Sequence, residues 1–524
     1  MSPRGASEIG AGLAPVRVAR PIAAGERIHV VGAAGAGASA AALLAAWGGA
    51  VVDGCDPGGT SQYTPALDAM GIVVAGMHDR THVSRGPRPA RLAVTKALTA
   101  IDPDNPELLA ARGLGIPLEP WQQVVADAAA GRQLIAVAGT HGKSTSSGWL
   151  LHVLAAGGAD PGGFVGALLP AALTGIGVPA TARRGSGRPF VVEADEYAGN
   201  FDAYRPDVIV MTSAEWDHPD VFADCEAVIA AFEAWIRRAG ERRNPGDGLE
   251  LVANIADPGV SDLVGRLVDW PGRITATSVI AAQDLADAAA KITRGYASAS
   301  GPVTALVGRI TAAEPGATIL EVHGLDGTGE LREVRLPTAG HHNASNALGV
   351  AGAALAAGLS PLAVIEALAT FEGVGRRLER KGEAAGVVVY DDYGHHPTAI
   401  RETLAAVRQR EPGRPIWAVY EPLTYHRTAA LLDAFADALA GADAVAIADI
   451  WAGRDPDTTV ASAEGLARAV AVREPAIPVA APGSVEATAR WLSGEVRSGD
   501  VVLVMGGGRS YRIGELLLEH LGSR

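Results

Sequence analysis

The most specific chemical pattern in the chain is a short loop that combines glycine, lysine and hydroxyl side chains. Its sequence is Gly139-Thr140-His141-Gly142-Lys143-Ser144-Thr145. Glycines let backbone N–H groups approach phosphate oxygens, Lys143 adds a positive charge, and Ser144 can bind magnesium. The common spacing would place glycine where this chain has Val137, so spacing alone also permits a glycine turn with an incidental lysine. The apolar run before the loop and the expected helix after it favour phosphate binding.

Two acidic segments follow apolar runs further along the chain. Glu193-Ala194-Asp195-Glu196 comes directly after Val191-Val192, and Asp217-His218-Pro219-Asp220 comes shortly after residues 208–211. Taken alone, each segment is better explained as an ordinary acidic loop. Carboxylates and an imidazole at successive strand ends would, however, suit divalent ions, because ligands of open α/β sheets bind at the strand C-termini.

A second glycine loop lies near the start of the chain and contains Gly32, Gly35 and Gly37. It predicts a phosphate-binding helix N-terminus, or alternatively a dinucleotide site with Asp53 or Asp56 on a ribose. The glycines at 506–508 are more simply explained by tight packing between a strand and a helix. The basic residues Arg376-Arg377 and Arg380-Lys381 are readable either as a solvated patch or as part of a site.

The elements that position these residues follow a repeated α/β pattern. Residues 28–31 and 134–137 are expected strands that run into glycine turns and helices. From residue 387 onward, apolar runs at 387–390, 416–420, 444–448 and 501–505 alternate with expected helices, which indicates a separate parallel-sheet domain. The last domain boundary is expected near residues 371–380.

Composition limits the class of protein. A net charge of −14 over 524 residues argues against broad attraction to nucleic acid or anionic lipid. The two cysteines, Cys55 and Cys225, have no partner in metal-ligand spacing, so neither a disulfide framework nor a zinc site is implied. Residues 1–20 lack the apolar core of a signal peptide, and the uncharged, Ala- and Gly-rich stretches 30–52 and 344–365 fit buried helices better than membrane spans. We therefore expect a cytoplasmic protein without membrane insertion.

Taken together, the motifs resemble those of the Mur ligase family, in the family's order. The segments that carry the resemblance are the loop 139–144, Glu193-Ala194-Asp195-Glu196-Tyr197, Asp217-His218-Pro219-Asp220, Gly340-His341-His342-Asn343-Ala344-Ser345-Asn346 and Asp391-Asp392-Tyr393-Gly394-His395-His396-Pro397-Thr398. The resemblance implies a three-domain α/β fold: a Rossmann-like UDP-binding domain, a central P-loop ATPase-type domain and a Rossmann-like C-terminal domain. We expect these domains at 26–125, 126–370 and 371–524, after a flexible tail at 1–25.

The resemblance also implies roles for individual residues around ATP and magnesium. Lys143 would contact the phosphates, with the rest of the loop, Gly139, Thr140, His141, Gly142 and Thr145, around them. Ser144 and Glu193 would hold one Mg²⁺, and His218 would serve a second metal. The residues that would approach the nucleotide from elsewhere are His342 and Asn346 at the adenine, and Arg377 and Asp391 from the last domain.

The remaining roles concern the acceptor and the UDP-linked substrate. His395, His396 and Arg427 would position the incoming amino acid or an acyl phosphate. Gly32, Gly35, Gly37 and Asp56 would bind the UDP portion. The expected catalytic residues are Lys143, Glu193, His218, Arg377 and His396.

Within the family, the chain looks most similar to members that join L-alanine to the carboxylate of UDP-N-acetylmuramate during peptidoglycan precursor synthesis. The expected reaction passes through an acyl phosphate and releases ADP and phosphate, and we expect a monomer or weak homodimer. Leu423 stands where these members have a histidine near the amino-acid site. The alternatives are a ligase that recycles murein tripeptide, a catalytically silent nucleotide-binding homologue and, from a different class, a nicotinamide-dependent oxidoreductase.

Overall fold

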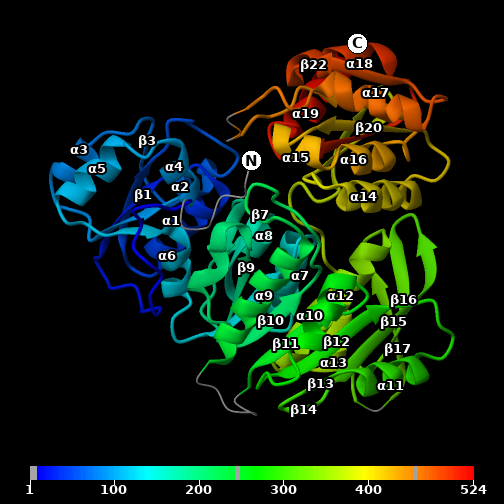
Figure 1. Cartoon of the computed structure of the whole chain (residues 1–524), viewed down its shortest axis with the longest axis horizontal. Helices are drawn as coiled ribbons and strands as arrows, with labels where there is room; N and C mark the ends of the chain where they lie inside the picture. Colours follow the sequence, from blue (N-terminus) through cyan, green and yellow to red (C-terminus); the bar gives the residue numbers. More distant parts are fainter. Residues whose placement is uncertain (1–8, 242–247, 328, 454, 456, 524) are drawn as a thin grey trace.

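The computed structural model describes residues 9–241, 248–327, 329–453, 455 and 457–523. The chain folds into three lobes in sequence order, each built on a mainly parallel sheet with helices packed on its faces (Figure 1). The three-domain α/β fold expected from the sequence is therefore confirmed.

The first lobe contains a five-stranded parallel sheet in the order β3-β2-β1-β4-β5. Its strands are β1 (Arg27–Val31), β2 (Val51–Cys55), β3 (Val74–Ala75), β4 (Arg91–Val94) and β5 (Leu118–Pro120). Its helices are α1 (Ala36–Trp47), α2 (Thr64–Ala69), α3 (Thr81–Ser84), α4 (Lys96–Ile101), α5 (Pro106–Gly113) and α6 (Trp121–Ala128). Most alanines of α1 are buried and let this helix pack closely on its neighbours, and Ser39 reaches Thr181 of the middle lobe at 3.2 Å.

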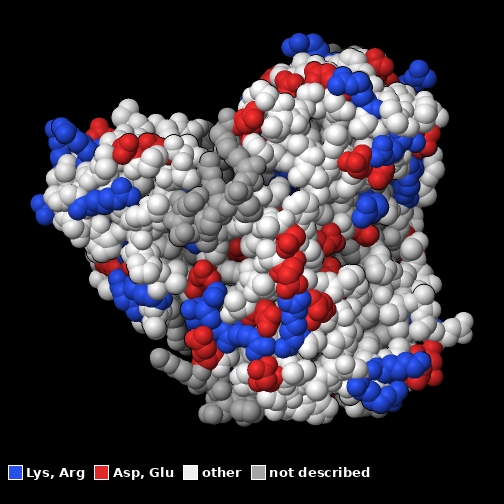
Figure 2. Space-filling model, viewed as in Figure 1, with Lys and Arg blue, Asp and Glu red and all other residues white. Residues whose placement is uncertain are grey.

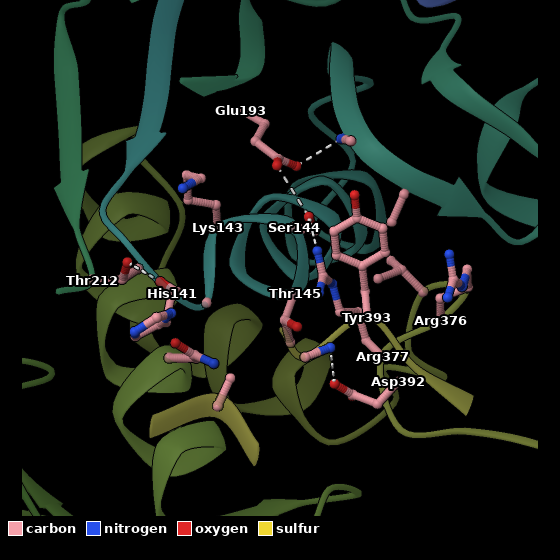
Figure 3. Close-up of a pocket in the computed structure, with 18 of the residues that line it drawn as sticks. His141, Lys143, Ser144, Thr145, Glu193, Thr212, Arg376, Arg377, Asp392 and Tyr393 are labelled. Atoms are coloured by element: carbon pink, nitrogen blue, oxygen red, sulfur yellow. Dashed lines mark hydrogen bonds between the residues drawn. The ribbon is translucent and has the colours of Figure 1, made fainter. Parts of the chain in front are cut away.

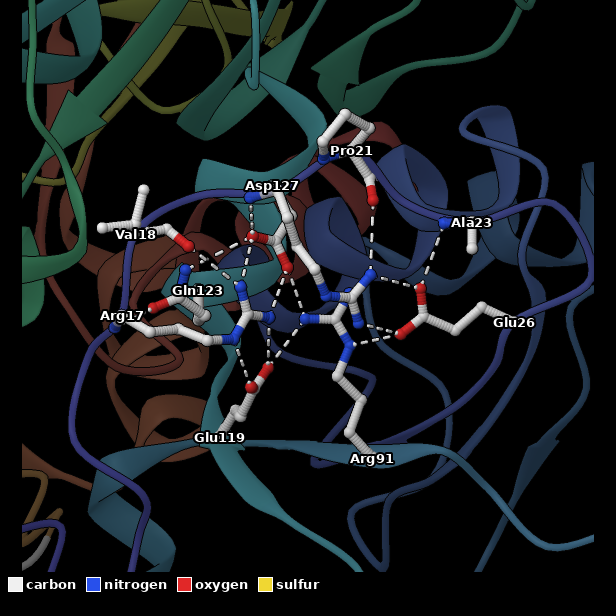
Figure 4. A network of polar contacts seen from close by, with 10 residues as sticks. Arg17, Val18, Pro21, Ala23, Glu26, Arg91, Glu119, Gln123 and Asp127 are labelled. Atoms are coloured by element: carbon white, nitrogen blue, oxygen red, sulfur yellow. Dashed lines mark hydrogen bonds and ion pairs between the residues drawn. The ribbon is translucent and has the colours of Figure 1, made fainter.

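The segment before β1 differs from the expected loose tail. Ile9 is buried, and Arg17 donates to Glu119 at 2.8 Å and to Asp127 at 2.7 Å (Figure 4). Arg91, which is 2% exposed, donates to the same two carboxylates. Two buried acids and one buried arginine leave room for a second cation, and the pairing ties the tail at Arg17 to the first lobe, while Ile9 packs against Tyr197 and Ala198 of the middle lobe.

The middle lobe contains a ten-stranded sheet in the order β17-β16-β15-β12-β11-β10-β6-β9-β7-β8. Its strands are β6 (Gln133–Ala138), β7 (Gly162–Leu169), β8 (Ala180–Arg183), β9 (Pro189–Ala194), β10 (Val208–Met211), β11 (Glu250–Asn254), β12 (Arg273–Val279), β15 (Thr304–Glu314), β16 (Ala317–His323) and β17 (Leu331–Leu336), with a separate hairpin of β13 (Ala297–Ser298) and β14 (Gly301–Pro302). Its helices are α7 (Lys143–Ala156), α8 (Ala171–Thr174), the 3₁₀ helix η1 (Tyr197–Ala203), α9 (Cys225–Gly240), α10 (Pro258–Arg266), α11 (Leu285–Gly295), α12 (His341–Ala356) and α13 (Pro361–Leu368). Strands β6, β9 and β10 are parallel neighbours, so their C-terminal ends meet at one edge of the sheet.

The third lobe contains a six-stranded sheet in the order β18-β19-β23-β20-β21-β22, parallel except for β18. Its strands are β18 (Glu379–Ala384), β19 (Val387–Asp392), β20 (Ile416–Glu421), β21 (Ala444–Ala448), β22 (Val479–Gly483) and β23 (Val501–Gly506). Its helices are α14 (Pro397–Arg410), α15 (Tyr425–Ala430), α16 (Leu432–Leu439), α17 (Ala463–Arg473), α18 (Val485–Glu495) and α19 (Tyr511–Gly522).

The uncharged stretches that resembled membrane spans are internal elements. Residues 30–52 form the end of β1, a glycine turn, α1 and the start of β2. Within the described ranges, no helix combines the length and the apolar character needed to cross a bilayer.

Charges on the surface are locally paired. Figure 2 shows acidic and basic side chains close together on the viewed face, and on α9 and α10 Arg237 pairs with Glu233 and Arg266 with Glu226. The net negative charge therefore coexists with local neutralisation on these helices.

Candidate active site

The candidate site is a large cavity of about 1590 Å³ that all three lobes line. It lies at the C-terminal ends of β6, β9 and β10, which is where open α/β sheets bind ligands. The first lobe contributes Tyr63 and Trp121, and the third contributes Arg377 and Tyr393. A drug-sized ligand pocket is typically about 300–1,000 Å³, so this cavity has room for more than one substrate.

Most of the site residues predicted from the sequence line this cavity. They are Gly35 and Gly37 of the first glycine loop, the phosphate-loop residues Thr140, His141, Gly142, Lys143, Ser144 and Thr145, and also Glu193, His218, His342, Asn346, Arg377, His395 and His396. Among the described residues, the predicted ones that lie outside the lining are Gly32, Asp56, Gly139, Asp391 and Arg427.

The phosphate loop joins β6 to α7 and depends on two glycines with positive φ. A Cβ atom at Gly139, where φ is +133°, would lie 2.3 Å from Thr212 Oγ1. A Cβ atom at Gly142, where φ is +77°, would lie 2.5 Å from Asn346 Oδ1. Because non-bonded atoms do not approach this closely, a side chain at either position would displace its neighbour, so both positions require glycine. Without such side chains, the N-terminus of α7 stays open to an anion.

Ser144 and Glu193 lie side by side across the ends of β6 and β9 (Figure 3). Ser144 donates to Glu193 Oε1 at 3.1 Å, and the backbone N–H of Gly166 donates to Glu193 Oε2 at 2.6 Å. Arg377 reaches over from the third lobe and donates to Ser144 Oγ at 2.8 Å. The hydroxyl and carboxylate oxygens are the donors that Mg²⁺ prefers, so their chemistry fits the predicted metal pair.

Lys143 and His218 meet around Glu196, the last carboxylate of the acidic segment 193–196. Lys143 Nζ lies 3.1 Å from Glu196 Oε2, and His218 Nε2 lies 3.9 Å from Glu196 Oε1. Burial opposes the charge of Lys143, but the nearby carboxylates, Glu196 first, outweigh it and raise the pKa of the ammonium group. Asp195, Glu196 and His218 each offer one possible metal-ligand atom, and these three atoms lie within 4.8 Å of one another.

Arg427 anchors this group to the third lobe. It donates to Asp217 Oδ1 at 2.7 Å and lies 3.1 Å from His218 Nδ1. His218 has φ +55°, a conformation that costs a non-glycine residue free energy and is often found at functional sites. Arg427 therefore acts on the cavity through His218 and Asp217.

A second contact between the middle and third lobes joins His141, Glu215 and His396. Glu215 Oε2 lies 3.4 Å from His141 Nε2 and 3.8 Å from His396 Nδ1, and Thr398 donates to it at 2.7 Å. Burial opposes ionisation of Glu215, but His141 and Thr398 outweigh it and lower its pKa to about 2. Burial lowers the pKa of His396 to about 4, so this imidazole is neutral at pH 7.

The predicted adenine residues lie on α12, which begins just after Gly340. Asn346 is held beside the phosphate loop and donates to Asn343 Oδ1 at 3.4 Å, while His342 lies 3.5 Å from Glu402. Asp391 is fully buried instead of facing the cavity, where its neighbour Asp392 lies.

Arg376 holds the start of the third lobe together and is not part of a solvated patch. It is buried, donates to Asp391 at 2.9 Å and to the carbonyl of Gly506 at 2.8 Å, and lies over the rings of Tyr393 and Tyr511. The glycines at 506–508 pack tightly, but against strand β20 and neighbouring loops instead of the expected helix: a Cβ at Gly506 would lie 2.4 Å from the Glu421 carbonyl.

The glycine loop of the first lobe faces the cavity only through its second half. Gly35 and Gly37 line the cavity at the uncapped N-terminus of α1, and a Cβ at Gly37 would lie 2.2 Å from the Trp121 ring. Asp56 lies behind the loop and accepts the Ala34 N–H at 3.0 Å. Its carboxylate therefore shapes the loop.

Leu423, which replaces an expected histidine, lines the cavity together with Trp451. His426 lies nearby in sequence but bonds Asp455, 3.1 Å from Nδ1. The wall here is apolar, and no signal in the sequence pointed to Trp451 or Trp121.

Comparison with known proteins places these motifs in one family. Residues 27–133 match the Mur ligase family, catalytic domain, residues 137–354 match the Mur ligase middle domain, and residues 376–508 match the Mur ligase, glutamate ligase domain. The chain is 39% identical over 502 residues to the UDP-N-acetylmuramate–L-alanine ligase of Kineococcus radiotolerans, covering 95% of this chain and 97% of the relative. It is 35% identical over 524 residues to that of Frankia casuarinae, covering 95% and 98%.

Solved structures share the fold. The UDP-N-acetylmuramate-alanine ligase of Thermotoga maritima has a TM-score of 0.72 at 23% identity, covering 95% of this chain and 99% of that one. A murein peptide ligase from Psychrobacter arcticus has a TM-score of 0.67 at 23% identity, with the same coverage. With the loop, the acidic segments and the three-lobed cavity in the positions described above, the chain belongs to the Mur ligase family.

Proposed function

We propose that this chain joins L-alanine to the carboxylate of UDP-N-acetylmuramate at the expense of ATP, in peptidoglycan precursor synthesis. The observation that carries the proposal is that one cavity contains the phosphate loop, the Ser144–Glu193 pair and the open N-terminus of α1. Relatives 35–39% identical over nearly their whole length are named for this reaction, which supports the same assignment here.

The chemistry needs charge stabilisation twice. The substrate carboxylate attacks the γ-phosphate and ADP leaves; the amine of L-alanine then attacks the acyl carbon, loses a proton and expels phosphate. Lys143 and Arg377 both reach the phosphate loop, and in this proposal they stabilise the negative charge that builds up on the transferred phosphoryl group. The neutral imidazole of His396 is able to accept the proton of the amine.

Magnesium fits the donors on two sides of the loop. We assign one ion to Ser144 and Glu193, and a second to Asp195, Glu196 and His218. When bound, such ions neutralise phosphate charge and polarise the phosphoryl oxygens. The positioning of reactants falls to the protein, and the contact of Arg377 with Ser144 brings the third lobe to the phosphate loop.

A second candidate function follows from the apolar wall at Leu423 and Trp451, which lacks the histidine of the alanine-adding members. A ligase that accepts a murein tripeptide would suit a wider acceptor site. A cytoplasmic location agrees with two free cysteines and with ATP as substrate. We also predict a monomer or weak homodimer, and light scattering measures this oligomeric state.

The test is product formation by wild-type protein and by Lys143→Ala, with Lys291→Ala, an exposed lysine on α11, as the control. We expect the wild type and Lys291→Ala to form ADP, phosphate and the alanyl product, detected by mass spectrometry. Lys143→Ala, with its fold retained, should lose turnover by about 100- to 1,000-fold. No turnover by the wild type would instead identify a silent homologue.

A further inference from the structure

A cluster of metal-binding side chains lies inside the first lobe, outside the cavity described above. It consists of His29 on β1, Cys55 at the end of β2, His82 on α3 and Glu107 on α5. One ligand atom of each lies within 4.8 Å of all the others. The four residues are up to 78 positions apart in sequence, from His29 to Glu107. No short metal-binding motif in the sequence therefore indicated the cluster.

Glu107 is at the centre and has no exposed surface. Its Oε2 accepts from the Cys55 thiol at 2.9 Å and lies 3.5 Å from His29 Nε2, while its Oε1 lies 2.5 Å from His82 Nδ1. A further imidazole, His78 Nδ1, lies 3.2 Å from Cys55 Sγ. Five groups able to bind a soft or borderline cation thus converge on one point.

The orientation of His29 is an independent sign of a ligand. Its side chain is 2% exposed, and its Nδ1 lies 2.6 Å from Asp53 Oδ1. With the Nδ1 hydrogen given to this carboxylate, the other nitrogen, Nε2, faces the cluster, where it lies 3.5 Å from Glu107 Oε2 and makes no hydrogen bond within the described residues. A carboxylate that orients a histidine toward a cation is the usual outer layer of a metal site.

We propose that His29, Cys55, His82 and Glu107 form a binding site for a transition-metal ion of the zinc type. Cysteine, histidine and carboxylate are the ligands of tetrahedral zinc, and a thiolate and a carboxylate balance the two charges of the ion inside the protein. Ligand atoms around tetrahedral zinc are roughly 3.5 Å apart, so the side chains move by less than about 1 Å. The ion displaces the Cys55 thiol proton and the Nε2 proton of the His29 imidazolium, and both protons pass to water.

The site has a structural role because four protein ligands leave no open position for a substrate. The carbonyl of Cys55 accepts the N–H groups of Gly32 at 2.9 Å and of Ala33 at 3.0 Å. A bound ion therefore connects α3 and α5 to the start of the glycine loop. His82 and His78, 23% and 13% exposed, give the ion a path from solvent.

The competing account is a metal-free ion cluster. Although burial opposes its charge, the carboxylates of Asp53 and Glu107 raise the pKa of His29 to about 9. His29 and Cys55 in turn lower the pKa of Glu107 to about 2 against the effect of burial. An imidazolium paired with Glu107 would fill the same space, and the two accounts differ in whether a metal ion binds through sulfur.

The experiment is a titration of the metal-stripped full-length protein with Co²⁺, followed by the thiolate-to-cobalt absorption band. The other two groups of possible metal ligands, His141–Glu215–His396 and Asp195–Glu196–His218, contain no sulfur. An ion bound at either group therefore does not produce this band. We expect one sulfur-bound cobalt per chain in the wild type and in Cys225→Ser, where the exposed cysteine is removed, and none in Cys55→Ser. Absence of the band in the wild type, or its survival in Cys55→Ser, would overturn the proposal.

Two further variants guard against misfolding of Cys55→Ser. Asp53→Asn leaves all four ligands in place and should weaken Co²⁺ binding about 10- to 100-fold, as loss of an outer-layer partner does. His82→Ala should weaken or abolish the thiolate-to-cobalt band, whereas His520→Ala on α19 should keep the band at wild-type strength. A band of wild-type intensity and affinity in His82→Ala would contradict the site.

Discussion

At the scale of single residues, the phosphate loop depends on the absence of side chains as much as on their presence. Gly142 and Gly177 have nearly the same backbone φ, +77° and +76°, but only Gly142 has a neighbour in the way, Asn346. The pair therefore separates the cost of a positive φ from the cost of filling the space beside the loop.

We predict that Gly142→Ala loses nucleotide binding while Gly177→Ala keeps it. Both substitutions pay the cost of a left-handed backbone, about 1–2 kcal/mol. In Gly142→Ala the new methyl group also pushes Asn346 away and distorts the loop. Calorimetric titration with ADP measures the difference, and equal affinities in the two variants would show that the loop tolerates a side chain here.

Glu193 and His218 are each predicted to support metal-bound charge in the transition state. Glu193→Gln and His218→Ala should each lower kcat by about 100-fold or more. Glu233→Gln, on the outer face of α9, is the control and should leave kcat unchanged. Rates near the wild-type value at saturating magnesium would remove these residues from the metal sites.

Sequence reasoning located Ser144, Glu193 and His218 because each follows a strand whose C-terminal end faces the site. It missed Glu196 and Glu215 as partners of Lys143 and His141, since these pairings cross between separate loops. It also predicted that Asp391 faces the nucleotide, whereas Asp391 is buried and its neighbour Asp392 lines the cavity, because successive side chains of a strand point to opposite faces.

At the scale of elements, the connection into the third lobe is the most strained segment around the site. Arg376 and Leu378 have φ of +58° and +50°, and the buried Arg376–Asp391 pair holds them in place. A buried pair that loses one partner leaves an uncompensated charge, which makes this segment sensitive to a single substitution.

Arg376→Ala should therefore destabilise the third lobe by about 3–5 kcal/mol. Arg380→Ala is the matched control: its pair with Glu383 is about half exposed and should be worth less than about 1 kcal/mol. Hydrogen exchange of the amides of β19 and β23 measures the effect where it occurs. Unchanged protection in Arg376→Ala would mean that the pair does not hold the segment.

The contact between α14 and the loop after β10 should weaken at acidic pH. The pKa of Glu215 is depressed from 4.5 to about 2, so its stabilisation is complete above pH 4.5 and is lost as the pH falls toward 2. We expect Glu215→Gln to lower the melting temperature at neutral pH, with the difference from wild type shrinking over that interval. Glu366→Gln, exposed on α13, should show no such trend; a constant difference for Glu215→Gln would contradict the pairing.

The repeated pattern of the third lobe was predictable, and β19, β20, β21 and β23 lie where their apolar runs indicated. Strand β18 was not predicted because its sequence, Glu379–Ala384, is polar and lies at the sheet edge, where only one side needs a partner. Strand β22 is likewise a short edge strand of small residues. Edge strands carry little hydrophobic signal because they bury little apolar surface.

At the scale of the whole molecule, the site exists only where three lobes meet. The Arg377–Ser144 contact joins residues 233 positions apart, and the Thr398–Glu215 contact joins residues 183 apart. No local pattern encodes such distances, so the sequence indicated the three domains but not how closely they approach. Resemblance to a family supplied the expectation that they share one site.

The most direct test of the central claim is ATP-dependent phosphate release with magnesium and UDP-N-acetylmuramate, comparing L-alanine, L-serine, glycine and a murein tripeptide as acceptors. The account predicts that L-alanine gives the highest kcat/KM, in keeping with the relatives named for this reaction. A preference for the tripeptide would contradict alanine addition and identify the recycling reaction instead.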